Sequence, residues 1–175
     1  APKFVAPYRE GGKNDGNAAE AICEAVGRPN MRFVPIKSVE QQSVLTLHRV
    51  RQGFVEERTA TINRIRGLLA EFGHVLPQRA VEVRRRLPEL LEQLPPLAAR
   101  ALTDLHAHVR ALDQRILDYE RELERLARTD ERARRVQALY GVGPLTAAAI
   151  IASVGNAHEF QNGRQFAAWL GLVPR

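Results

Sequence analysis

The run Lys13-Asn14-Asp15 places a cation, an amide and a carboxylate directly before a predicted helix. Two-metal phosphoryl transfer requires several carboxylates that converge on a pair of ions about 4 Å apart. Asp15 is therefore a candidate catalytic acid and Mg²⁺ ligand. Glu20 and Glu24 lie one helical turn apart and are expected to solvate the helix, because Asp15 and Glu20 point in different directions. An acid just before a helix also commonly caps the free backbone N–H groups, so both interpretations of Asp15 remain open.

A second motif with possible chemistry is Gly141-Val142-Gly143-Pro144, which lies between two predicted helices. It can be a left-handed helix stop followed by proline in the first turn of the next helix. It also resembles a helix-hairpin-helix, in which free backbone donors around Gly141 and Gly143 hold a phosphate without reading bases. The sequence leaves both interpretations open. The arginines expected to flank the hairpin are Arg132, Arg134, Arg135 and Arg164.

The charge balance favours a nucleic-acid partner. The chain has a net charge of +6 and a sequence pI near 10.2, and only three of its 26 basic residues are lysine. Arginine pairs bidentately with phosphate, although arginine richness also arises from GC-rich coding or from solvated helix faces. Further candidate backbone contacts are Lys13, Arg84, Arg85 and Arg86.

Cysteine content and hydropathy indicate a cytoplasmic protein with no membrane partner. Cys23 is the single cysteine, so no disulfide can form within the chain. This fits a reducing compartment. The longest apolar run, residues 145–154, is too short to cross a bilayer.

The elements that position these motifs are organised around a heptad helix over residues 97–127, which begins after Pro95-Pro96. Its apolar positions alternate by three and four, as in the seam of a coiled coil. We expect this helix to form an antiparallel arm with a preceding long helix and to leave its seam for a second chain. The chain is therefore predicted to be at least a dimer. The seam consists of Leu102, Leu105, Val109, Leu112, Ile116, Tyr119, Leu123 and Leu126.

The preceding helix is predicted to begin at a capping box, residues 38–41, and to reach Phe72 before Gly73 ends it. Its apolar set keeps helical spacing but breaks heptad order at Arg51 and Arg58. Short helical pieces over residues 79–86 and 89–94 are expected in the proline-rich bend between the two long helices.

Towards the N-terminus, Phe4-Val5 could form an edge strand, and residues 31–36 form a β-like run. Asp15 or Asn17 is expected to cap a helix to Val26 whose buried stripe includes Ile22, Ala25 and Val26.

Towards the C-terminus, Thr129 or Asp130 should cap a helix to Tyr140, followed by the hairpin and an Ala-rich helix over residues 145–154. Asn162 should cap a last helix whose Phe166 and Trp169 form an aromatic anchor.

Nearly the whole chain resembles the DEDD insertion-sequence transposases, the family usually numbered one hundred and ten. The resemblance includes Lys13-Asn14-Asp15 and Gly141-Val142-Gly143-Pro144. The stretches that carry it are residues 13–25, 31–38, 40–42, 48–49, 63, 66–73, 141–147 and 162–175.

The resemblance implies a DNA recombinase that moves its own element. It implies a resolvase-like domain with four acids and Mg²⁺, a coiled-coil arm that joins subunits, a second domain with a serine nucleophile, and a guide RNA encoded by the element. The family motif is Lys-Asn-Asp, two residues, then Asp-Ala, so Asp15 corresponds to the third acid and Ala18 replaces the fourth. The first two acids are expected upstream of Ala1 and the serine beyond Arg175. We therefore expect this chain to be truncated and inactive.

These observations together predict a mainly α protein in three parts. Residues 1–37 would end a resolvase-like α/β catalytic domain, and residues 38–128 would form the antiparallel coiled-coil arm. Residues 129–175 would begin the C-terminal transposase domain with a helix-hairpin-helix-like segment. The predicted function is DNA transposition with element-end DNA, target DNA and guide RNA as partners. The alternative is a non-catalytic coiled-coil module that binds nucleic acid and dimerises.

Overall fold

The computed structural model describes residues 2–29, 31 and 36–172 and divides the chain into two units, Ala1–Ile36 and Lys37–Arg175. Within these described ranges the regular structure is helical and contains no strand. A mainly α chain is therefore confirmed. The predicted β-like run at 31–36 falls largely on residues 32–35, which lie outside the described residues.

The first unit contains α1 (Pro2–Val5), the 3₁₀ turn η1 (Ala6–Tyr8) and α2 (Asp15–Val26). The predicted edge strand at Phe4-Val5 is wrong, because both residues lie in α1. Proline is tolerated in a first helical turn, where its missing N–H has no intrahelical partner, and Pro2 occupies that position. This part of the chain therefore begins as a helix.

The start of α2 is capped by Asn14 rather than by the predicted Asp15 or Asn17. The Asn14 side-chain oxygen accepts a hydrogen bond from the Asn17 backbone N–H at 2.7 Å. Ala21 and Ala25 are the residues that α2 buries, whereas Ile22 and Val26 are more than half exposed. The predicted stripe is thus correct at Ala25 only, because α2 packs against η1 through its small residues.

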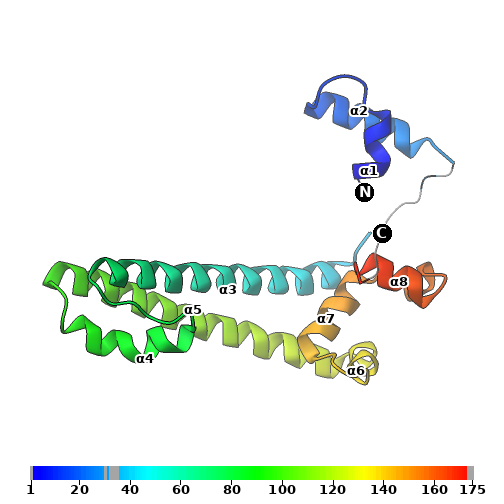
Figure 1. The fold of residues 1–175 in the computed structure, drawn as a ribbon. Coiled ribbons are helices and arrows are strands. Elements are labelled where there is room, and N and C mark those ends of the chain that lie inside the picture. The colour runs from blue at the N-terminus through cyan, green and yellow to red at the C-terminus, as the bar shows by residue number, and fades with distance from the viewer. Residues whose placement is uncertain (1, 30, 32–35, 173–175) are drawn as a thin grey trace. The chain divides into compact units, whose positions relative to one another are not determined.

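In the second unit, α3 (Val39–Glu71) and α5 (Pro96–Thr129) pack side by side along the arm (Figure 1). The predicted capping box is confirmed, since Ser38 Oγ accepts from the Gln41 backbone N–H and Gln41 Oε1 accepts from the Ser38 backbone N–H. At the other end, Gly73 has φ +84°. The His74 N–H bonds to the Leu69 carbonyl, which is the Schellman arrangement.

The heptad seam of α5 is covered within the chain. Leu102, Val109, Leu112 and Leu123 are at most 2 % exposed. The expectation that the seam is left for a second chain is therefore wrong, because α3 and α4 already cover it. The core cluster of the arm consists of Ile62, Ile65, Leu69, Leu76, Val83, Leu87, Leu90, Leu94, Leu102 and Val109. Self-association of the chain stays a prediction that needs another surface.

The bend between the two long helices contains one helix, α4 (Ala80–Leu91), in place of the two short pieces predicted. Pro88 lies inside this helix, where it removes one backbone hydrogen bond. Val83, Leu87 and Leu90 are buried against the arm, and this apolar burial outweighs the lost bond. α4 thus closes the core at one end of the arm (Figure 1).

At the other end of the arm lie α6 (Glu131–Gln137), α7 (Pro144–Ser153), the 3₁₀ turn η2 (Ala157–Glu159) and α8 (Gly163–Trp169). α7 packs on both long helices, and small residues allow the close approach, since Ala127, Ala133 and Ala147 are about 1 % exposed or less. Asp130 caps α6 as one of the two predicted caps, but α6 ends at Gln137 rather than at Tyr140. The predicted Asn162 cap is confirmed.

No described helix is long and apolar enough to span a bilayer.

Candidate nucleic-acid interface

The hairpin between α6 and α7 exposes backbone at both glycines. Gly141 takes up φ +84°, and Gly143 is the extended N-cap of α7 with Pro144 as the first helical residue. The structural interpretation of the motif is confirmed for Pro144 in the first turn of α7, but Gly141 lies beyond Ala138, the right-handed C-cap of α6, so it is not the residue that ends that helix. A Cβ added at Gly143 would meet no atom within 4 Å. The start of α7 is thus open to a ligand, and its first-turn N–H groups have no intrahelical acceptor.

The hairpin also carries exposed side chains. Tyr140 is fully exposed and Leu139 is 64 % exposed, directly before Gly141. The Val142 N–H donates to the Leu139 carbonyl at 3.1 Å, which closes the turn. Gly143 contributes only its carbonyl to α7, which accepts from the Ala147 N–H at 3.0 Å. The turn is therefore held by its own backbone, with no side-chain cap at the start of α7.

The arginines around the hairpin differ in how much of their charge is already paired. Arg132 bonds to Asp130 with Nη2–Oδ2 at 2.8 Å, and Arg135 pairs with Glu131. The Arg132 side chain lowers the pKa of the Asp130 carboxyl, and the same contact raises the pKa of the Arg132 guanidinium. Arg134 and Arg164 form no ion pair with any described residue. Arg134 lies on α6, which leads into the hairpin, whereas Arg164 lies on α8, which follows α7, so Arg134 is the unpaired arginine on an element that borders the hairpin.

The run Arg84-Arg85-Arg86 lies on α4, at the end of the arm opposite to α6 and α7 (Figure 1), so it does not form one site with the hairpin. Arg84 is paired with Asp113 of α5, with Nη2–Oδ1 at 2.8 Å and Nε–Oδ2 at 3.0 Å. Arg85 pairs with Glu82 on α4 itself. Arg86 is exposed and has no ion pair within the described part of the chain. The three arginines therefore have three different environments.

Asp15 is exposed in the first turn of α2, next to the exposed Lys13. Because Asn14 supplies the cap, the interpretation of Asp15 as the capping residue is wrong. Ala18 lies three residues later on the same face, and its methyl group offers no ligand atom. The described residues contain no group of three His, Cys, Asp or Glu side chains that could hold a metal. Asp15 and its described neighbours therefore do not fit Mg²⁺ by themselves.

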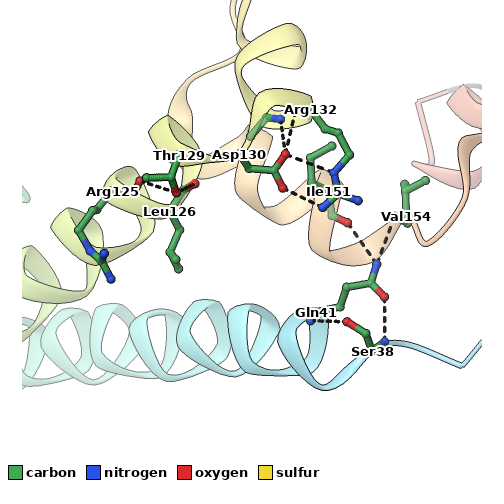
Figure 2. Close-up of polar contacts among 10 residues, drawn as sticks. Ser38, Gln41, Arg125, Leu126, Thr129, Asp130, Arg132, Ile151 and Val154 are labelled. Carbon is green, nitrogen blue, oxygen red and sulfur yellow. Dashed lines mark hydrogen bonds and ion pairs between the residues drawn. The ribbon is translucent and has the colours of Figure 1, made fainter.

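The junction between the arm and α7 depends on Gln41, which sequence analysis treated only as part of a capping box. Its Nε2 donates to the carbonyls of Ile151 and Val154 at 3.4 Å each, while its Oε1 accepts from the Ser38 N–H at 2.9 Å (Figure 2). One amide thus satisfies the start of α3 and the end of α7. A glutamine at this position was the available signal, because glutamate in the same capping box cannot donate.

Comparison with known proteins places the two ends of this chain in one family. Residues 1–74 match the family model DEDD_Tnp_IS110, described as a transposase. Residues 133–175 match the model described as the transposase IS116/IS110/IS902 family. A Pseudomonas aeruginosa protein named "Probable family 20 transposase" is 47% identical over 180 residues, covering 100% of this chain and 53% of that protein. The chain belongs to the IS110 family of transposases.

Further relatives of this IS110-family chain are transposases of named elements. The transposase for insertion sequence element IS1111A of Coxiella burnetii is 45% identical, covering 100% of this chain and 49% of that protein. The transposase for IS1328 of Yersinia enterocolitica is 41% identical, covering 100% of this chain and 53% of that protein. The chain thus spans about half the length of these curated relatives. No solved structure matches it.

Proposed function

We propose that this IS110-family chain is the part of an insertion-sequence transposase that carries one catalytic acid, a helical arm and a phosphate-contacting hairpin. The observation that carries the proposal is the similarity of the entire chain to transposases of three bacteria at 41–47% identity. One family model matches residues 1–74, which include α3 of the arm, and the other matches residues 133–175, which begin within α6. The segment between them, with α4 and α5, therefore connects two parts that match one transposase family.

The proposed partners are element-end DNA, target DNA and a guide RNA encoded by the element. The net charge of +6 supports a polyanionic partner, and the open backbone at Gly143 supports contact with phosphate rather than with base edges. Arg134, on the helix that leads into the hairpin, is the unpaired cation expected to supplement the hairpin amides, and Arg164 on α8 would contact phosphate separately. A further proposed partner is a second copy of the chain. The seam between α3 and α5 is not available to it.

The proposed catalytic role of Asp15 is that of the third family acid, with Ala18 in place of the fourth. One carboxylate cannot place two metal ions against a scissile phosphate, since Mg²⁺ sites of this kind draw on several converging acids. We therefore propose that the 175-residue chain binds nucleic acid but does not cut it. The comparisons do not favour a purely non-catalytic scaffold as its origin, because its relatives are named transposases.

The test is binding of a labelled DNA duplex, and of an RNA of the same sequence, measured by fluorescence anisotropy. We expect log K to fall linearly as log salt rises between about 50 and about 200 mM, with a slope near −0.9 for each phosphate contacted on duplex DNA. Gly143→Leu should weaken binding. Gly163→Leu is the matched control, because Gly163 also begins a helix, α8, and also has open space around it.

The proposal fails if binding does not depend on salt. The hairpin assignment fails separately if Gly143→Leu and Gly163→Leu weaken binding equally while circular dichroism shows both variants folded.

A further inference from the structure

A cluster of cations lies where α3, α4 and α5 meet. Asp113 of α5 accepts from Arg58 of α3 with Nη1–Oδ1 at 3.1 Å and from Arg84 of α4 through both of its carboxylate oxygens. The three side chains are between 28% and 34% exposed. Two guanidinium groups therefore share one carboxylate at a place that solvent reaches, and one positive charge is left over.

Two more basic residues extend the cluster along the same side of α5. Arg110 and His106 lie three and seven residues before Asp113, which puts all three on one helical face. Arg110 is exposed. Burial lowers the pKa of His106, and the charges of Arg110 and Arg84 lower it further. The field of Arg84 and Arg110 thus extends to the imidazole of His106.

We propose that this arm cation cluster, Arg58, Arg84, His106 and Arg110 around Asp113, is a binding site for the phosphodiester backbone of a nucleic acid. The inference rests on the proposed nucleic-acid function and adds a contact near the middle of the arm, away from the hairpin, since Asp113 lies midway along α5. Two guanidinium groups share the Asp113 carboxylate, and Arg110 adds a third on the same face of α5. A phosphate would supply the missing negative charge and accept from N–H groups that Asp113 leaves unused.

Asp113 is the positioning residue of the cluster. It holds Arg58 and Arg84 from two different helices beside each other, so little side-chain freedom is lost when an anion binds. Arginine suits this role because its planar fork can bond a carboxylate on one edge and a phosphate on another. If Asp113 served only to tie the three helices together, the excess charge would merely be solvated and Arg110 would be dispensable.

The experiment compares Arg110→Gln with Arg100→Gln in the whole chain. Both residues are exposed on α5, and neither forms an ion pair with a described residue, so both variants should fold normally. Arg100 lies outside the cluster and is the matched control. We expect Arg110→Gln to weaken binding of a DNA duplex several-fold and to reduce the salt slope by about one, whereas Arg100→Gln has a smaller effect on both. A parallel titration with an RNA duplex shows which backbone the cluster prefers.

The site-specific measurement follows the imidazole protons of His106 by NMR across pH. A phosphate among Arg58, Arg84 and Arg110 screens their charge, so the pKa of His106 should rise when DNA or RNA is added, and Arg100→Gln should keep this rise. The inference is overturned if bound nucleic acid leaves the pKa of His106 unchanged, or if Arg110→Gln and Arg100→Gln behave alike. If Gly143→Leu loses binding and Arg110→Gln does not, the arm site is wrong and the proposed nucleic-acid function still stands. Absence of binding by the wild-type chain would overturn both.

Discussion

Replacing Gln41 by glutamate separates its two roles at the junction of α3 and α7 (Figure 2). The carboxylate can still accept from the Ser38 N–H, so the capping box survives. It cannot donate to the carbonyls of Ile151 and Val154, and it places a negative charge beside the C-terminal end of α7. The variant should therefore loosen α7 from the arm without unwinding α3.

The size of the effect follows from the geometry. Both lost hydrogen bonds are 3.4 Å long, so each belongs at the low end of the usual net range of about 0.5–1.5 kcal/mol. The added charge is unfavourable at the end of α7 and favourable in the first turn of α3, each by about 0.3–1 kcal/mol, so these two contributions nearly cancel. We expect Gln41→Glu to lower the free energy of unfolding by about 1 kcal/mol, which corresponds to a Tm lower by about 2–4 °C for a unit of this size.

The measurement is urea denaturation followed by circular dichroism, with Gln42→Glu as the control. Gln42→Glu is the same substitution one residue further along α3. Gln42 is exposed and forms no hydrogen bond with α7 in the described part of the chain. If the two variants have the same stability at neutral pH, the contact between Gln41 and α7 contributes nothing and the reasoning is refuted.

Three further predictions concern the arm and its caps. Leu112→Ala should lower the free energy of unfolding by about 2–5 kcal/mol, because Leu112 is buried within the chain. The sedimentation coefficient should not change, and dissociation of a dimer in this variant would contradict the prediction. Gly67→Ala should stabilise α3 by about 0.5–1 kcal/mol, since Gly67 is an exposed helical residue with open space around it. Thermal melting should show a higher Tm for this variant, and a lower Tm would contradict the prediction. Asp130→Ala should remove a cap worth about 1 kcal/mol. Because Arg132 lowers the pKa of Asp130 in the folded chain, the stability that Asp130 contributes is fully present above its unfolded value of 3.8 and is lost as pH falls through the lower folded value. The gap between wild type and variant should shrink in that acidic window, and a gap independent of pH would contradict the assignment.

Local signals predicted both ends of α3, because each end depends on a few neighbouring residues, whereas the cap of α2 and the end of α6 were predicted wrongly. Ser38 with Gln41 and the glycine at position 73 were sufficient to place both ends of α3. The partner of the α5 seam could not be predicted in the same way. A heptad pattern requires an apolar partner but does not say which helix supplies it.

The information on that partner was present in α3, in the residues that break its heptad order. Arg51 and Arg58 interrupt the apolar pattern, and in the structure they pair with Glu120 and Asp113 of α5. Cations on one helix that match acids on the other at compatible spacing indicate that these two helices pair in an antiparallel register. Gln41 was missed for a similar reason, since its second role depends on α7, more than a hundred residues away.

The candidate catalytic site was predictable only as far as Asp15. The motif identifies the residue, but a metal site is a constellation of side chains brought together by folding, and Ala18 supplies no ligand. The described residues add no group of acids or histidines near Asp15 that sequence analysis overlooked.

Strand cleavage on element-end DNA, with guide RNA and Mg²⁺ supplied, is the most direct test of the proposed catalytic role. Three proteins are compared: the 175-residue chain, its Ala18→Asp form, and a version extended to the length of its relatives with the family acids present. We predict cleavage by the extended protein alone, because Ala18→Asp adds one carboxylate to a site that still lacks the rest of the constellation. Cleavage by the unaltered 175-residue chain that survives repurification and disappears in Asp15→Ala would contradict the account.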